Sequence, residues 1–123
     1  MKIIYTGIFI EKLPNNIVPA FSNTPKLLHI TDKFRPAKNE LRHELLGKEV
    51  KIEILGIGNN NRNQALLTKD EILGYGHITV SWVDGSTPKE SKMIKEWVKF
   101  QEPIVIYGTY GYFNGKGISF SFK

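Results

Sequence analysis

The stretch Gly76-His77-Ile78-Thr79-Val80-Ser81-Trp82-Val83 has the clearest secondary-structure pattern in the chain. Polar side chains at positions 77, 79 and 81 alternate with apolar side chains at positions 78, 80 and 82. Such alternation is typical of a half-buried β-strand, because successive side chains of a strand point to opposite faces. We therefore predict a strand over residues 76–83 with His77, Thr79 and Ser81 on its polar face.

The tripeptide near the start of this stretch occurs twice. His29-Ile30-Thr31 repeats His77-Ile78-Thr79 at a spacing of 48 residues. The first copy lies in a predicted strand over residues 27–34, where strict alternation would continue the histidine and threonine face with Lys33 and Arg35. A basic pair in line with an imidazole and a hydroxyl is suited to phosphate, although both polar faces could equally be solvated surfaces.

Strand-forming runs make up most of the remaining chain, and we expect mainly antiparallel pairing. The Asn-rich segment 59–63 predicts a turn, and Asn114-Gly115 predicts a hairpin between the last two strands because both residues tolerate positive φ. Three prolines in residues 13–26 indicate an irregular connection. The predicted strands cover residues 2–10, 27–34, 49–57, 64–68, 76–83, 104–113 and 117–122.

One helix is predicted after the second tripeptide. Thr87 and Glu90 form a Thr-x-x-Glu capping box, and Pro88 suits the first turn. Pro103 would end the segment, and a second, shorter helix over residues 39–46 would end at Gly47. The predicted apolar face of the first helix consists of Met93, Ile94, Trp97 and Val98.

The composition fits a small globular protein. The chain has 123 residues, of which 41% are hydrophobic, so we expect a single domain over residues 1–123. It has neither an apolar run long enough for a bilayer nor a signal-peptide pattern, which favours the cytoplasm and no membrane partner. The absence of cysteine excludes thiolate chemistry. A net charge of +5 favours polyanionic partners without requiring them.

The paired tripeptides resemble the motifs of the 2H phosphoesterases. In that family two His-x-Thr or His-x-Ser motifs, one per lobe of a pseudo-symmetric α+β fold, face each other across a cleft. The resemblance implies a two-lobed fold with mainly antiparallel sheets around a central cleft and one or two helices. The spacing between the motifs is similar to that of compact viral, phage and RNA-repair-associated members. Asp32 stands where the first motif of the family normally has an apolar residue.

The resemblance also implies a metal-independent phosphodiesterase that needs no cofactor. One of His29 and His77 would remove a proton from water or a 2′-hydroxyl, while the other would protonate the leaving oxygen. Thr31 and Thr79 would donate hydrogen bonds to the nonbridging phosphate oxygens. The substrate would be a nucleotide, an oligonucleotide or an RNA end with a 2′,3′-cyclic phosphate, a 2′-5′ linkage or a cyclic backbone.

Four further residues are candidates for substrate binding. Lys33 and Arg35 would bind phosphate, Ser81 extends the second polar face, and Tyr5 is one of several aromatic residues suited to stacking on a base. Each also has a simpler role in a solvated strand or in packing. The alternative function is a noncatalytic RNA- or nucleotide-binding β-rich module. A zinc nuclease is less well supported, since no residues have recognisable metal-ligand spacing. The oligomeric state stays open.

Overall fold

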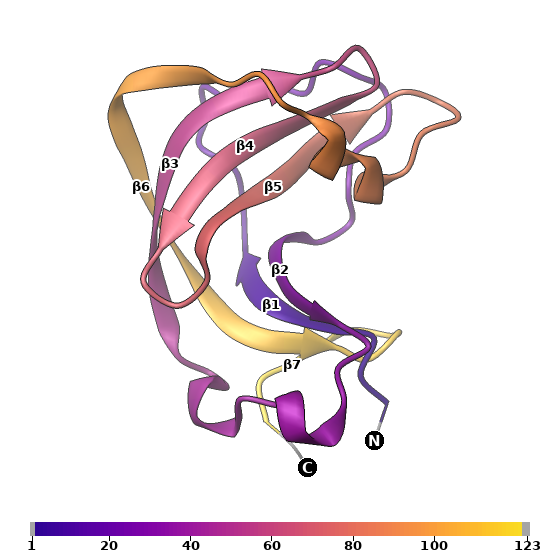
Figure 1. Ribbon diagram of the computed structural model, residues 1–123, viewed down its shortest axis with the longest axis vertical. Helices are drawn as coiled ribbons and strands as arrows, with labels where there is room; N and C mark the ends of the chain where they lie inside the picture. Colours follow the sequence, from indigo (N-terminus) through magenta and orange to yellow (C-terminus); the bar gives the residue numbers. More distant parts are fainter. Residues whose placement is uncertain (1, 122–123) are drawn as a thin grey trace.

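The computed structural model describes residues 2–121, which form seven β-strands and three short 3₁₀ helices (Figure 1). The strands are β1 (Tyr5–Ile10), β2 (Leu28–Phe34), β3 (Glu49–Asn59), β4 (Asn63–Asp70), β5 (Gly74–Trp82), β6 (Val98–Phe113) and β7 (Ile118–Ser119). The 3₁₀ helices are η1 (Lys38–Glu40), η2 (His43–Leu45) and η3 (Pro88–Met93). The predicted excess of strand over helix is confirmed.

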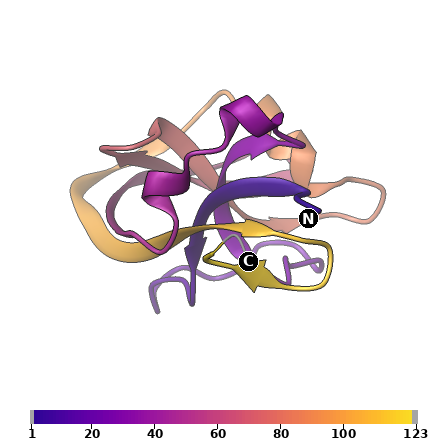
Figure 2. The ribbon, with the colours of Figure 1, turned by 90° about the horizontal axis from the view of Figure 1, so that it is seen from below.

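All strands belong to one antiparallel sheet in the order β2-β1-β6-β3-β4-β5, and β7 pairs with β6. The two motif strands, β2 and β5, are therefore the outermost strands of the ladder. The sheet curls into a nearly closed barrel that brings β2 and β5 close together (Figures 1 and 2). The described strand pairs include none between β2 and β5. We call the line along which these strands approach each other the seam.

The long strand β6 makes this curvature possible, because it pairs with β3 along much of its length and then with β1. It sweeps around one side of the molecule in Figure 2. Gly108 lies where β6 passes from one partner to the other. A Cβ atom at this position would lie 2.6 Å from Ile8 Cγ2 and 2.8 Å from the Phe9 carbonyl oxygen. Only glycine permits so close an approach.

The inner face of the rolled sheet carries one hydrophobic core. Both tripeptides contribute their central residue, since Ile30 and Ile78 are almost completely buried. This confirms that the histidine and threonine of each copy lie on the opposite face from the isoleucine. The remaining core residues come from five strands and are Ile8, Ile10, Val50, Ile52, Ile54, Leu66, Val80 and Tyr110.

Each motif strand contains a β-bulge directly after its tripeptide. In β2, Thr31 pairs with Gly7 but Lys33 pairs with Thr6, so Asp32 is the extra residue. In β5, position 79 pairs with position 65 and position 81 with position 64, so Val80 is the extra residue. A bulge reverses the alternation of the residues that follow it. The predicted polar faces are therefore correct only as far as the threonines.

Most predicted strands and turns are confirmed with shifted ends. The segment 59–63 connects β3 to β4, and Gly115, with φ +95°, lies in the turn between β6 and β7. Residues 13–26 form an irregular connection, in which Asn23 forms an isolated β-bridge with Trp82. The predicted end of the last strand, Phe122, lies outside the described residues.

The predicted long helix is wrong. Only η3 forms, with the Glu90 carboxylate accepting the Thr87 backbone N–H at 3.0 Å as expected of a capping box. Ile94 is already extended, and β6 begins at Val98, which pairs with Ile57 of β3. Strand pairing thus overrides the helical spacing of the apolar residues. Pro103 lies within β6, in a stretch that has no partner in β3.

The other helical prediction fails in a similar way. Residues 39–46 form two single turns, η1 and η2, in place of one helix. Gly47 still ends the segment with φ +78°, as expected of a residue after a helical turn. No α-helix occurs within residues 2–121, so the one or two helices expected from the resemblance are present only as 3₁₀ turns.

Asp32, the extra residue of the β2 bulge, turns its carboxylate inward. The Tyr110 hydroxyl donates to Asp32 Oδ2 at 2.5 Å, and Arg42 Nε lies 3.8 Å from the same oxygen. The Asp32 side chain is only 7% exposed. Burial and the Asp32 hydrogen bond raise the pKa of Tyr110 to about 12. The Tyr110 hydroxyl therefore supplies the hydrogen bond that the buried Asp32 carboxylate needs.

We expect Asp32→Ala to lower the free energy of unfolding by about 1–3 kcal/mol, because the buried Tyr110 hydroxyl loses its acceptor. Urea denaturation measures this change. The matched control is Lys33→Ala, which removes a solvent-accessible ion pair with Glu40 and should cost under about 1 kcal/mol. Equal losses in the two variants would contradict the assigned role of Asp32.

Candidate functional site

The two tripeptides meet at the seam. His29 and Thr31 lie on β2, and His77 and Thr79 lie on β5, all on the face of the sheet opposite the core. The two edge strands run in opposite directions, because five successive antiparallel pairs separate them in the ladder. The start of β2 therefore lies near the end of β5. His29, from β2, accordingly lines the same small cavity as Thr79 and Trp82 from β5.

Aromatic rings and a carbonyl fix the orientation of His29. Its ring stacks on Tyr5 with the centroids 4.5 Å apart, and Phe9 lies 5.9 Å away on the same strand as Tyr5. His29 Nδ1 lies 3.2 Å from the Leu27 carbonyl oxygen and 3.4 Å from the Tyr5 hydroxyl. A carbonyl only accepts, so Nδ1 donates in this contact and Nε2 keeps its lone pair. His29 is thus held in the tautomer that suits a base at Nε2.

Both motif histidines favour the neutral form. Burial lowers the pKa of His29 below 6.5, the Leu27 carbonyl opposes this shift, and the charge of His77 lowers the pKa further. Burial also lowers the pKa of His77. This electrostatic effect acts across the seam, where β2 and β5 approach each other. Because two adjacent imidazolium ions repel each other, the state with one charge is preferred to the state with two.

The second threonine is held by η3. Thr79 Oγ1 lies 2.9 Å from Ser91 Oγ and 3.3 Å from the Pro88 carbonyl oxygen. Ser91 in turn accepts from Asn63 Nδ2 at 3.1 Å. This network holds η3 against β4 and β5 on the motif face. A ligand oxygen at Thr79 would replace the Pro88 carbonyl as the acceptor of its hydroxyl proton.

The small cavity encloses about 220 Å³ beside His29 and Thr79. Tyr5 and Trp82 contribute aromatic walls, and Lys26 contributes a positive charge. The cavity thus combines an imidazole, a hydroxyl, aromatic rings and one cation. The structure thus places Tyr5, His29 and Thr79 around one cavity. Two motif residues, His77 and the exposed Thr31, do not line this cavity.

Ser81 is not on the motif face, and its predicted place there is wrong. The bulge at Val80 turns the Ser81 side chain inward, where it is 0% exposed. Its hydroxyl lies 2.6 Å from Gln64 Oε1 and accepts from the Phe21 N–H at 3.1 Å. Ser81 therefore fastens the irregular connection to the sheet, and a ligand at the seam does not reach it.

Lys33 is turned away for the same reason. The bulge at Asp32 pairs Lys33 with Thr6, on the opposite face from Thr31, and Lys33 Nζ lies 3.8 Å from Glu40 Oε2. The prediction that it continues the histidine line is wrong. Arg35 follows the strand with φ +46° and places its guanidinium carbon 5.3 Å from the centre of the Phe34 ring.

Besides Lys26, sequence analysis missed three residues of this region. The bulges bring Phe34 and Trp82 onto the motif face, although alternation places both on the apolar side. Lys89 of η3 has its ammonium nitrogen 4.6 Å from the centre of the Phe34 ring. A signal was present in the chain, since an aromatic residue follows each motif histidine at the same spacing of five residues.

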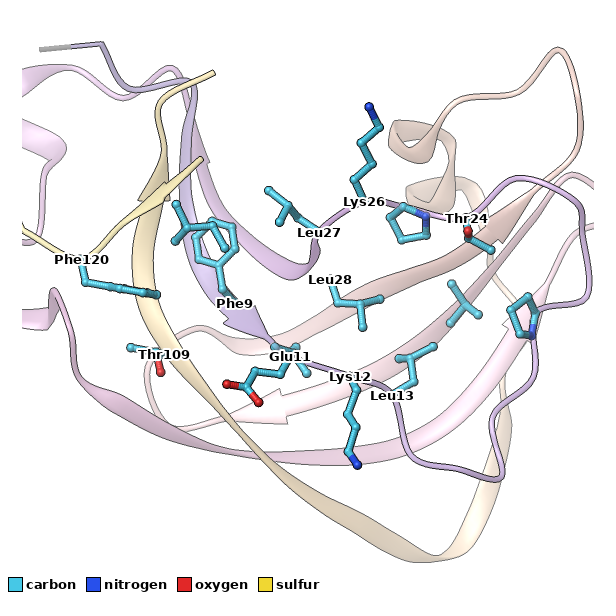
Figure 3. A pocket seen from close by; sticks show the side chains of 15 residues that line it. Phe9, Glu11, Lys12, Leu13, Thr24, Lys26, Leu27, Leu28, Thr109 and Phe120 are labelled. Atoms are coloured by element: carbon cyan, nitrogen blue, oxygen red, sulfur yellow. The ribbon is translucent and has the colours of Figure 1, made fainter. Parts of the chain in front are cut away.

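A larger cavity of about 730 Å³ adjoins the small one (Figure 3). Its lining is mostly apolar, with Phe9, Leu28 and Phe120 around it and Lys12 extending from its rim. The two cavities share the wall formed by residues 25–27. The larger cavity contains none of the four motif residues, so its size alone does not mark it as the site of the chemistry.

Neither a metal-binding cluster nor a membrane-spanning helix occurs within residues 2–121. No group of three or more His, Asp or Glu side chains is arranged there to hold a metal ion. None of the helical segments there has the length and apolar character needed to cross a bilayer. Comparison with known families, curated proteins and solved structures finds no match to this chain. The site is therefore interpreted from its own geometry.

We expect His29 and His77 to titrate below pH 6.5 in the folded protein. Since the unfolded chain then binds more protons, the contribution of the two histidines to stability is constant well above pH 6.5 and falls as the pH is lowered through that value. NMR titration of the imidazole protons measures both midpoints, with the protein in urea as the reference. A folded-state midpoint at or above the urea value for either residue would contradict the assigned burial.

Proposed function

We propose that this protein is a metal-independent phosphodiesterase that uses His29 and His77 as a general acid and base pair. The observation that carries the proposal is the meeting of two copies of one tripeptide at the seam, although 48 residues separate them in the chain. A repeated motif needs no such juxtaposition for folding alone. Each copy lies on the outermost strand of one half of the sheet, β2-β1-β6 or β3-β4-β5.

This arrangement supports a compact version of the two-lobed 2H phosphoesterase fold. In our proposal the two halves of the sheet correspond to the two lobes, and the seam takes the place of the central cleft. The difference from the expected form is the continuous β6–β3 pairing, which joins the halves into one sheet.

The proposed reaction is in-line displacement at phosphorus. The neutral imidazole takes a proton from water or a 2′-hydroxyl as its oxygen bonds to phosphorus, and the opposite imidazolium gives a proton to the leaving oxygen as its bond breaks. The lowered pKa values of both histidines favour the neutral base. The negative charge of the bound phosphate stabilises the single imidazolium that the acid requires.

The threonines and Lys26 stabilise the charge on the phosphate. Thr79 lines the small cavity with His29, and its hydroxyl is already oriented by η3. Thr31 offers an exposed hydroxyl on the neighbouring strand. Hydroxyl donors held on strands can stabilise the charge that develops on the phosphate. Candidate substrates are a 2′,3′-cyclic phosphate, a 2′-5′ linkage and a cyclic oligonucleotide.

A noncatalytic nucleotide-binding module is the second candidate. It is favoured by Phe34, which is 51% exposed and lies beside the cations of Arg35 and Lys89. An exposed aromatic ring with basic neighbours is typical of surfaces that bind single-stranded nucleic acids. In that case, loss of Phe34 would weaken binding and loss of either histidine would not.

The test is hydrolysis in EDTA of 2′,3′-cyclic nucleotides, 2′-5′ and 3′-5′ oligoadenylates and cyclic dinucleotides. We expect turnover of at least one substrate and a fall in kcat of about 10²–10⁴-fold in each of His29→Ala and His77→Ala. His43→Ala, which removes the exposed histidine of η2, is the matched control and should keep full activity. Turnover that is unchanged in either motif variant would refute the mechanism.

A further inference from the structure

The two β-bulges give each motif strand an aromatic residue on the motif face. Phe34 follows His29 by five residues, and Trp82 follows His77 by five residues. Five steps of strict alternation would put histidine and aromatic residue on opposite faces. The extra residue in each strand reverses this, so that Phe34 pairs with Tyr5, and Trp82 with Asn63, on the motif face.

The contacts of these aromatic residues agree with this assignment. Tyr5, the partner of Phe34, stacks on His29, and Trp82 lines the small cavity with His29 and Thr79. Lys89 reaches Phe34 from η3, which packs against β5. Both aromatic side chains therefore belong to the surface that carries the motif residues.

The antiparallel course of β2 and β5 places the two aromatic residues at opposite ends of the seam. Trp82, at the end of β5, lies beside His29 near the start of β2. Phe34 lies at the other end of β2, roughly 15 Å further along the strand. The motif histidines and threonines lie between them.

We propose that the seam binds a phosphodiester with a nucleobase on each side, one stacking on Trp82 and the other on Phe34. This inference rests on the proposed function and narrows its substrate class to an internucleotide linkage. A 2′,3′-cyclic mononucleotide has one base, which can stack on only one of the two aromatic residues. A dinucleotide or longer strand can occupy both.

The charges around the aromatic residues match such a ligand. Lys26 lines the cavity beside Trp82, and Arg35 and Lys89 lie at the Phe34 ring. A base that stacks on Phe34 displaces one of these two cations from the ring face, and the displaced cation can then pair with a flanking phosphate. Each end of the seam thus offers a π-face for a base together with a positive charge for the backbone.

The test is direct binding to the inactive His29→Ala/His77→Ala protein, so that turnover does not enter the result. The probes are 2′-5′ and 3′-5′ diadenylates and adenosine 2′,3′-cyclic phosphate, measured by calorimetry. We expect Phe34→Ala and Trp82→Leu each to weaken diadenylate binding by roughly 5- to 150-fold. Tyr107→Ala, which removes an exposed aromatic side chain from β6, is the matched control and should leave the affinity unchanged.

A second measurement covers the case in which Trp82→Leu fails to fold. The chain has two tryptophans, so Trp97→Phe leaves Trp82 as the only one. We expect its fluorescence to be quenched by diadenylate. Absent quenching, or equal diadenylate affinity in the Phe34→Ala and Tyr107→Ala proteins, would overturn the inference.

The two proposals can fail separately. EDTA-resistant turnover of a cyclic mononucleotide alone, without diadenylate binding, would overturn the two-base substrate and leave the histidine mechanism intact. Diadenylate binding through both aromatic residues without turnover of any substrate would overturn the mechanism and support the two-base seam.

Discussion

A continuous ladder of antiparallel hydrogen bonds extends from β2 to β5 and determines where every motif residue lies. The motif strands β2 and β5 are the two ends of this ladder and do not pair with each other. The curvature of the strands between them nevertheless brings them side by side. Gly108 permits the close packing of β6 on β1 that this curvature needs. The candidate site is therefore a product of the whole sheet, and no single loop or hairpin contains it.

The strand content and the motif residues could be predicted from sequence because both depend on local patterns. Alternation identified β5, and the repeat identified His29, Thr31, His77 and Thr79. Pairing order could not be predicted in the same way, because it depends on contacts between residues far apart in the chain. The same limit explains the helix error, since Val98 pairs with β3 although its spacing from Ile94 suits a helix.

The bulges explain why the supporting residues were harder to predict than the motifs. A single extra residue at Asp32 or Val80 reverses every later side chain, and strict alternation contains no sign of it. Lys33 and Ser81 were therefore assigned to the wrong face, and Phe34 and Trp82 were overlooked. In the first motif, the sequence showed one irregular feature, which is that Asp32 stands at a position normally apolar. The hydrogen bond from the Tyr110 hydroxyl explains how this carboxylate is accommodated.

The unpaired edges of β2 and β5 have a consequence for solubility. The outermost strands of a flat sheet expose N–H and C=O groups that can recruit strands of other chains and start aggregation. Here the edges of β2 and β5 face each other, and η3 packs beside β5. Residues 25–27 line the small cavity next to β2. The curvature that assembles the candidate site thus also shields the two strands through which this sheet could otherwise polymerise.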